Sequence, residues 1–213
     1  MTRILLFACL MLTNALAQSA GIAPSAETVT PVLVGARVPD VAVRALDGET
    51  TSLADVVTGK PTVLVFYRGG WCPFCNLQLS QLNGIDKELV ALGYQVVAIS
   101  PDAPEKIQET LDKEKLGYSI YSDSGLAAIK AFGIGFRVPE ETVDKYRGYG
   151  IALAQAPGEA DSVLPVPSVF VIDAAGVIQF VYVNPDYRIR MSSELLLTAA
   201  RTSLAVKPLE PPK

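Results

Sequence analysis

Short apolar runs rich in valine and isoleucine alternate along this chain with longer segments in which apolar residues recur every three or four positions. The runs predict strands and the periodic segments predict amphipathic helices, because side chains repeat every two residues on a strand and about every 3.6 on a helix. The predicted strands span residues 62–67, 95–100, 119–122, 168–173 and 177–183. The predicted helices span 53–57, a long segment between Cys75 and Gly93, 104–116, 126–132, 140–146 and 192–205.

Turn residues add two hairpins to this pattern. Asp47-Gly48 joins residues 41–46 to 50–52, and a turn ending at Gly176 joins the last two predicted strands. Strand–helix alternation followed by a hairpin and a terminal helix predicts an α/β fold with a mixed central sheet and helices on both faces. Residues 41–52 would be an N-terminal hairpin extension. Residues 137–164, which contain several prolines and glycines, are the least regular part.

The N-terminus has the pattern of a targeting segment. A positively charged start precedes an apolar run over residues 4–16, and Ala15-Leu16-Ala17 fits a small-residue cleavage site. This pattern predicts a signal peptide over residues 1–17, with an uncleaved anchor as the alternative. We therefore expect an exported protein, periplasmic if its source is a Gram-negative bacterium and otherwise secreted, in a compartment where disulfides persist.

The rest of the chain is predicted to form one domain. Residues 18–37 are small, polar and proline-bearing and predict a flexible lead-in, while the proline-rich residues 207–213 predict a loose tail. Between them, residues 38–206 supply one core, since half of the 213 residues are apolar. No later segment is apolar for long enough to span a bilayer, so no stable membrane insertion is expected after cleavage. The net charge of −4 argues against nucleic acid as a partner.

The main chemical signal is the sequence Trp71-Cys72-Pro73-Phe74-Cys75, at the junction between a predicted strand and the long helix. A cysteine at a helix N-terminus faces unpaired backbone N–H groups and the positive end of the helix dipole, which favour its thiolate. The second cysteine lies one turn further on the same face, within reach of a mixed disulfide at the first. Cys72 is therefore the predicted nucleophile and Cys75 the resolving thiol, in a thioredoxin-like arrangement.

Two other uses of the cysteine pair are less favoured. A structural zinc site needs four ligands, usually cysteine and histidine, and this chain has no histidine and only Cys9 as a third cysteine. A disulfide closing so short a loop would stabilise the fold by only about 2 kcal/mol. We therefore expect a redox-active pair that needs no metal or other cofactor, with a structural disulfide as the alternative.

The residues next to the pair suggest how it is activated. Without histidine, the activators available to Cys72 are the helix dipole, backbone amides and Arg68, whose guanidinium could reach the thiolate from the Arg68-Gly69-Gly70 turn. A solvated surface arginine is the alternative. Pro73 suits the first turn of a helix, where no N–H is needed. We expect Trp71 to shape a docking surface beside an exposed Cys72, with a core position as the alternative.

A second element of the predicted site is the loop that contains Val166 and Pro167, just before a predicted strand. In a thioredoxin fold this loop lies opposite the cysteine pair, where the backbone of Val166 could pair with an extended substrate peptide. Proline at this position is also compatible with a cis Val166–Pro167 bond.

Taken together, these segments resemble the peroxiredoxin-like members of the alkyl hydroperoxide reductase/thiol-specific antioxidant (AhpC/TSA) family, within the thioredoxin superfamily. The resemblance extends from Val38 to Ala205 and rests on the blocks FYRGGWCPFCNLQLSQL, VVAISPD, YSDSGLAAIKAFGI, LPVPSVFVIDAAGVI and NPDYRIR. It implies a thioredoxin-like fold, an antioxidant redox activity and a thioredoxin-like dithiol protein as electron donor.

The chain departs from typical peroxiredoxins at two positions and from thioredoxins at one. Gly69 stands where typical peroxiredoxins have threonine or serine, and Pro167 stands where they have arginine; in the family, those two groups orient the peroxide. Arg68 is a possible substitute for that arginine. Phe66 stands where thioredoxins bury an acidic residue.

The missing peroxide-orienting groups, together with Cys75 and Pro167, which thioredoxins also carry, favour thiol–disulfide exchange. In this reaction Cys72 attacks a substrate protein's disulfide and Cys75 resolves it. A thiol peroxidase that reduces hydroperoxides through a Cys72 sulfenic acid is the alternative. A third possibility is a thioredoxin-fold binding module whose disulfide never cycles.

Overall fold

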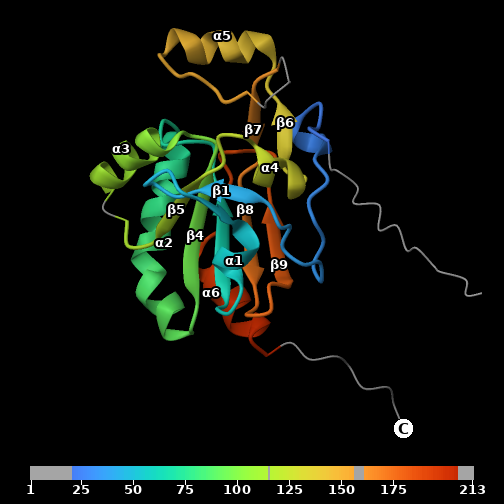
Figure 1. Cartoon of the computed structure of the whole chain (residues 1–213), viewed down its shortest axis with the longest axis vertical. Coiled ribbons are helices and arrows are strands. Elements are labelled where there is room, and N and C mark those ends of the chain that lie inside the picture. Colours follow the sequence, from blue (N-terminus) through green and yellow to red (C-terminus); the bar gives the residue numbers. More distant parts are fainter. Residues whose placement is uncertain (1–20, 115, 156–160, 206–213) are drawn as a thin grey trace, which may run out of the picture.

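The computed structural model describes residues 21–114, 116–155 and 161–205. They form a domain around a mixed seven-stranded sheet (Figure 1). Its strand order is β2-β1-β5-β4-β3-β8-β9. These strands are β1 (Ala42–Arg44), β2 (Thr50–Ser52), β3 (Thr62–Phe66), β4 (Gln95–Ser100), β5 (Ser119–Ser122), β8 (Ser168–Ile172) and β9 (Ile178–Val183). A second sheet pairs β6 (Gly135–Arg137) with β7 (Val163–Pro165).

Strands β3, β4 and β5 are parallel, whereas β8 pairs antiparallel with β3 and with β9. The β1–β2 hairpin joins the other side of the sheet through β5. The predicted mixed sheet and N-terminal hairpin are therefore both confirmed.

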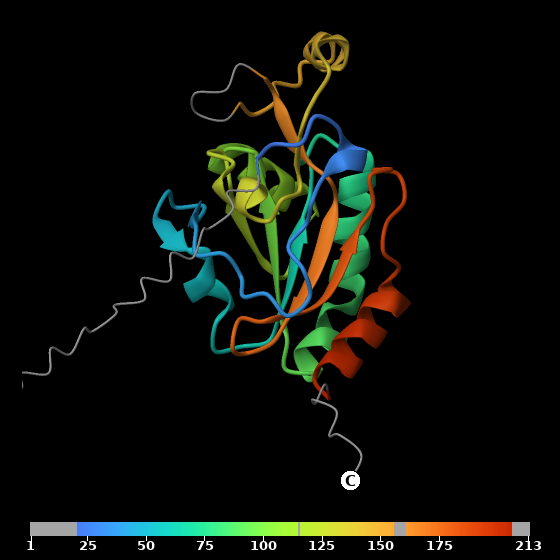
Figure 2. The ribbon, with the colours of Figure 1, turned by 90° about the vertical axis from the view of Figure 1, so that its right-hand side faces the viewer.

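Helices cover both faces of the main sheet, as predicted. The described residues form the helices α1 (Leu53–Val57), α2 (Pro73–Ala91), α3 (Pro104–Glu114), α4 (Ala127–Ala131), α5 (Glu140–Gly148) and α6 (Ser193–Ser203), and a short 3-10 turn, η1 (Ala26–Thr28). One apolar cluster joins α2 and α6 to one face of the sheet, and a second joins α1 and α4 to the other. Figure 2 shows α2 and α6 side by side along the sheet.

Local signals explain where several helices begin and end. The Ser52 and Ser192 side chains cap α1 and α6, accepting hydrogen bonds from the backbone N–H groups of Asp55 and Leu195. Helix α2 is followed by Gly93, whose φ of 88° is the left-handed conformation that commonly ends a helix. Pro73 occupies the first turn of α2, as predicted.

The structure differs from the sequence prediction over residues 135–165. The strands β6 and β7 are only three residues long. They are too short to show an alternation of apolar and polar residues, so they were not predicted. Between them lies α5, which confirms the helix predicted over residues 140–146. It buries none of its residues and stands apart from the main sheet at the top of Figure 1. The segment between β6 and β7, which contains α5 and is named the α5 arm, nevertheless contributes a side chain to the cysteine site.

Residues 21–37 also differ from the flexible lead-in that we expected. The backbone N–H groups of Thr30 and Val32 donate to Gly133 and Phe132, and that of Gly35 donates to Ile178. These bonds hold the segment along the body of the domain. The predicted signal peptide (1–17) and tail (207–213) lie outside the described residues. Within the described ranges, no helix is long and apolar enough to cross a bilayer.

Candidate active site

Cys72 is the N-cap residue of α2, directly after the turn that leaves β3. Its own N–H donates to the Gly69 carbonyl at 3.1 Å, and its carbonyl accepts from the N–H of Cys75 at 3.0 Å. Both cysteines are free thiols, and their side chains are hydrogen-bonded to each other. The predicted placement at a helix N-terminus, with the second thiol within reach, is therefore what the structure has.

The two thiols have opposite pKa shifts. The hydrogen bond from Cys75 is the largest cause that lowers the pKa of Cys72, which falls to about 6. The Cys75 backbone N–H and the charges of Arg68 and Arg190 lower it further, against the effect of burial. Burial, followed by the hydrogen bond and charge of Cys72, raises the pKa of Cys75. At neutral pH, Cys72 is therefore the thiolate and Cys75 its hydrogen-bond donor.

Our expectation of an exposed Cys72 was wrong. Only 1% of Cys72 is exposed and Cys75 is fully buried, because both belong to the apolar cluster between α2 and the sheet. Trp71 is only partly buried and packs against that cluster. Neighbouring side chains therefore cover the Cys72 sulfur almost completely.

Arg68 is 5% exposed, so it is not a solvated surface arginine. Its Nη2 donates to the hydroxyl of Tyr146 at 2.6 Å. Its guanidinium carbon lies 5.2 Å, 5.7 Å and 4.2 Å from the ring centroids of Trp71, Tyr146 and Tyr187, distances at which cation–π attraction operates. Tyr146 comes from the α5 arm and Tyr187 from the segment after β9, so three separate parts of the chain enclose this guanidinium.

Arg190 is a site residue that the sequence analysis did not identify. Its Nη2 donates to the Sγ of Cys75 at 3.4 Å, and its Nη1 donates to the Gln78 side chain at 2.7 Å. Its Nε donates to the Tyr187 carbonyl at 2.6 Å. The block NPDYRIR, which contributes to the family resemblance, was the available signal, but nothing in its spacing placed it beside the cysteines.

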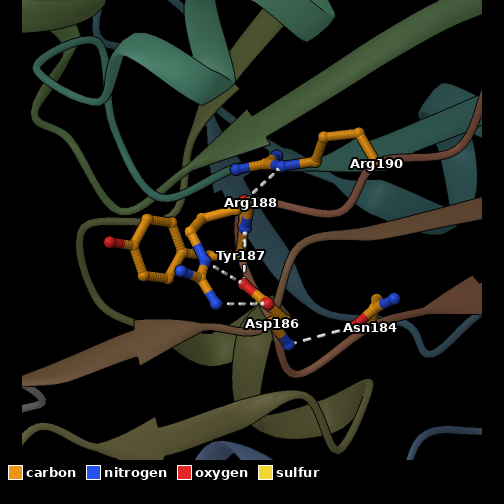
Figure 3. A network of polar contacts seen from close by, with 5 residues as sticks. All are labelled: Asn184, Asp186, Tyr187, Arg188 and Arg190. Atoms are coloured by element: carbon orange, nitrogen blue, oxygen red, sulfur yellow. Dashed lines mark hydrogen bonds and ion pairs between the residues drawn. The ribbon is translucent and has the colours of Figure 1, made fainter.

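The segment that carries Arg190 is held by its own polar contacts (Figure 3). The Asp186 carboxylate accepts from the Arg188 backbone N–H at 3.0 Å and from the Arg188 guanidinium at 2.8 Å. The Asn184 side chain accepts from the Asp186 N–H at 3.0 Å. Because Arg188 neutralises Asp186, that carboxylate is not the counter-ion of Arg190.

Val166 and Pro167 lie at the same end of the sheet as Arg68, because Ser168 pairs with Phe66 at the end of β3. Both residues are buried. The Val166 N–H donates to the Ile134 carbonyl at 2.8 Å, and the Val166 carbonyl accepts from the Ser168 hydroxyl at 2.7 Å. The bond between Val166 and Pro167 is trans. The Val166 N–H is already paired, so a substrate peptide could bind it only by displacing its bond to Ile134.

The geometry of the turn accounts for Gly69. Its φ is 146°, and a Cβ there would lie 2.3 Å from the Trp71 indole nitrogen. The tryptophan therefore takes the space that a threonine or serine side chain would need. The next N–H, that of Gly70, donates to the Asp102 carboxylate at 2.8 Å, which anchors the turn to the loop after β4.

A cavity of about 540 Å³ opens beside this turn. Its lining includes Trp71, Asp102, Lys106 and residues 150–154 of the α5 arm. The described residues contain no group of three or more histidine, cysteine, aspartate or glutamate side chains that could hold a metal ion.

A thiolate at a helix N-terminus, a second thiol beside it and two nearby guanidiniums are the features of a thioredoxin-fold oxidoreductase with a cysteine pair. The AhpC/TSA family model matches residues 34–181, and the chain belongs to the AhpC/TSA family.

Among curated proteins, the chain is 30% identical over 106 residues to peroxiredoxin Bcp of Escherichia coli, covering 50% of this chain and 67% of that relative. It is 27% identical over 161 residues to the chloroplastic peroxiredoxin Q of Populus jackii, covering 74% and 65%. Reduced Prx3 from Vibrio vulnificus superposes with a TM-score of 0.66 at 16% identity, covering 80% of this chain and 99% of that one. The Mycobacterium tuberculosis peroxidoxin BcpB superposes with a TM-score of 0.61 at 19% identity, covering 82% and 98%.

Proposed function

We propose that this chain is a two-cysteine thiol peroxidase that reduces hydroperoxides. The observation that carries the proposal is the position of Cys72, a low-pKa thiolate that is almost closed to solvent and lies near two guanidiniums. A hydroperoxide is small enough to reach such a sulfur. The names of the curated relatives, peroxiredoxin Bcp and peroxiredoxin Q, support the same activity.

In the proposed reaction, the Cys72 thiolate attacks the terminal oxygen of the hydroperoxide and the O–O bond breaks. The leaving oxygen takes a proton and departs as an alcohol, or as water when the substrate is hydrogen peroxide. Cys72 becomes a sulfenic acid, and Cys75 then forms a disulfide with it and releases water. A thioredoxin-like dithiol protein would return two electrons and two protons to the pair.

Arg68 is the proposed source of positive charge near the reacting oxygens. The family's arginine position holds Pro167, but Arg68 is buried near Cys72, and its Nη2 donates to Tyr146. Its Nε is buried without a hydrogen-bond partner. Arg68 is therefore the group proposed to stabilise the charge that develops on the leaving oxygen.

Stopped-flow oxidation of the reduced protein by hydrogen peroxide tests the peroxidase. The rate constant should exceed that of free cysteine at the same pH, and Cys72→Ser should abolish the reaction. Cys75→Ser should stop at the sulfenic acid, which a sulfenic-acid reagent would label on Cys72. A rate no faster than free cysteine would refute the proposal. If neither peroxide nor a disulfide substrate converts the cysteine pair between its dithiol and disulfide forms, the result would instead support a binding module.

Thiol–disulfide exchange with a protein disulfide is the second candidate. It is favoured by exposed apolar residues around the pair: Phe74 is 38% exposed and packs edge-on against Tyr187 at 5.7 Å. Ile189, on the same segment as Tyr187, is 52% exposed. Such a rim could accept a partner protein. Cys75→Ser should then trap mixed disulfides that are visible on a nonreducing gel, and their absence would count against exchange.

Export remains part of the proposal and rests on the pattern of residues 1–17. A fusion of these residues to a reporter that is active only outside the cytosol should give signal, whereas a fusion lacking residues 4–16 should not. Equal reporter activity in the two fusions would refute export.

A further inference from the structure

The cavity beside the turn at residues 69–71 is distinct from the cysteine pair. Its volume is about 540 Å³, and neither Cys72 nor Cys75 is among the residues that line it. One water molecule takes up about 30 Å³ in the liquid, so the cavity is much larger than hydrogen peroxide needs. Sites for small organic molecules in proteins have volumes of about 300–1,000 Å³. The cavity therefore has the size of a site for an organic molecule that the peroxidase reaction does not use.

Two side chains with acceptor oxygens meet at one end of this cavity. The Asp102 carboxylate accepts from the Gly70 N–H at 2.8 Å, and the Asn76 amide donates to the Gly70 carbonyl at 2.9 Å. Both side chains line the cavity, and a single glycine holds them near each other. The Oδ1 of Asn76 is buried without a hydrogen-bond partner, and leaving a buried acceptor unpaired is costly. This end of the cavity therefore suits a ligand with N–H or O–H donors.

The charge at this end is negative. Lys106 and Glu109 also line the cavity, but the Lys106 ammonium lies 2.8 Å from the Glu109 carboxylate, so these two charges offset each other. Within the described ranges, Asp102 forms no ion pair, and burial raises its pKa. A cation beside Asp102 would favour the ionised carboxylate, whereas a carboxylate or phosphate would be repelled by it. A primary ammonium, which has a positive charge and three donors, matches both acceptors.

The α5 arm supplies an apolar wall of the same cavity. Residues 151–154 of the arm are isoleucine, alanine, leucine and alanine, and all four line the cavity together with Trp71. Apolar walls that carry a few well-placed polar groups are typical of sites for small organic molecules. The lining therefore indicates a ligand with an apolar body and one polar end.

We propose that this cavity is a binding site for a small organic molecule that carries a primary ammonium group on an apolar body, and that Asp102 and Asn76 bind the ammonium. The bound molecule would contact both the α5 arm and the turn before Cys72. Because α5 itself buries no residue, these contacts should hold the arm, and with it Tyr146, against the domain. The proposed site goes beyond the peroxidase function and does not depend on it.

Three probes with the same alkyl chain test the site in the full-length protein: n-hexylamine, n-hexanol and n-hexanoate. Trp71, the single tryptophan, lines the cavity, so its fluorescence should report binding, and calorimetry gives the affinity. Hexylamine should bind saturably and at least tenfold more tightly than hexanoate, with hexanol between them. Asp102→Asn, which keeps an acceptor for the Gly70 N–H, should weaken hexylamine binding at least tenfold and hexanol binding less than twofold. Asp112→Asn is the matched control, because Asp112 is exposed, accepts from Gln108 and does not line the cavity.

A second variant and a second measurement locate the bound probe. Ala152→Phe, at an exposed residue of the cavity wall, should fill part of the cavity and weaken the binding of hexylamine and hexanol without changing the charge. Hydrogen exchange of the backbone amides over residues 150–154 should slow when hexylamine binds wild type, but not when it is added to Asp102→Asn.

Several results would overturn the proposal. They are the absence of saturable hexylamine binding, hexanoate binding as tight as that of hexylamine, and a hexylamine affinity of Asp102→Asn or Ala152→Phe within twofold of wild type. Unchanged hydrogen exchange in the arm would equally count against it. None of these measurements uses peroxide, so a protein without peroxidase activity could still bind the amine, and the two proposals fail separately.

Discussion

Arg190 donates a hydrogen bond to the Sγ of Cys75 at 3.4 Å across 115 positions of sequence. The contact joins the segment after β9 to the first turn of α2, and the same arginine holds Gln78 one turn further along. It places a cation at the Cys75 sulfur, while Arg68 carries a second one near Cys72. The chemistry of the pair therefore depends on charges from two distant parts of the chain.

The acidity of Cys72 should depend on Cys75. The Cys75 thiol is the largest cause of the lowered pKa, so Cys75→Ala should raise the pKa of Cys72 above its value of about 6. Alkylation of Cys72 by iodoacetamide, followed from pH 4 to pH 10, would give the midpoint for each protein. Cys75→Ser, which keeps a donor, should shift the midpoint less than Cys75→Ala. Equal midpoints in wild type and Cys75→Ala would contradict the assignment.

The stability of the reduced protein should rise between pH 6 and pH 8. The pKa of Cys72 is lowered in the fold from 9.0 to about 6, so its thiolate contributes stability that is fully present above pH 9 and is lost as the pH falls to 6. The slope due to this group is at most about 1.4 kcal/mol per pH unit.

Denaturant unfolding of wild type and Cys72→Ala under reducing conditions would isolate this contribution. The difference between the two unfolding free energies should grow from pH 6 to pH 8. Measurements should stop at pH 8, because the raised pKa of Cys75 has the opposite effect once unfolded thiols ionise. A difference that does not vary with pH would show that Cys72 ionises normally in the fold.

Restoring the family's threonine in the turn should harm the protein. Gly69→Thr places a side chain where the Trp71 indole lies, at a φ of 146°. We expect a loss of about 2–3 kcal/mol in the free energy of unfolding and a changed tryptophan emission spectrum. Gly84→Thr is the control, because a Cβ at Gly84 meets no atom within 4 Å, so the tryptophan spectrum should be unchanged. A stable, faster Gly69→Thr enzyme would argue against this account of the turn.

The hydroxyl of Tyr146 should matter for the rate of the reaction. Tyr146→Phe keeps the ring against Trp71 but removes the 2.6 Å hydrogen bond from Arg68. Loss of one such bond is worth about 1 kcal/mol, so the rate constant with peroxide should fall by roughly 2–10-fold. Tyr149→Phe, at a 68% exposed residue three positions further on, should leave the rate unchanged. Equal rates for the two variants would remove Tyr146 from the site.

Much of the fold could be predicted from the sequence, because its strands and helices carry local signals. The sequence pattern predicted α1, β4 and β5 at the bounds that the structure has, and the serine cap of α6 at Ser192. Buried strands are continuous apolar runs, and helices combine period with caps and terminal glycines. The helix α5 was also predicted, but the strands β6 and β7 on either side of it were not, because three residues are too few to show a strand period.

The amino-acid sequence by itself determined the cysteine pair, its place at the start of a helix and the order along the chain of the strands and helices other than β6 and β7, because these follow from neighbouring residues. Only the tertiary structure decided that Cys72 is buried, that Tyr146 and Tyr187 enclose Arg68, and that Arg190 faces Cys75. Each of these depends on segments far apart in sequence meeting at one end of the sheet. Burial and charge at the sulfurs, which set their reactivity, are properties of that meeting rather than of any one segment.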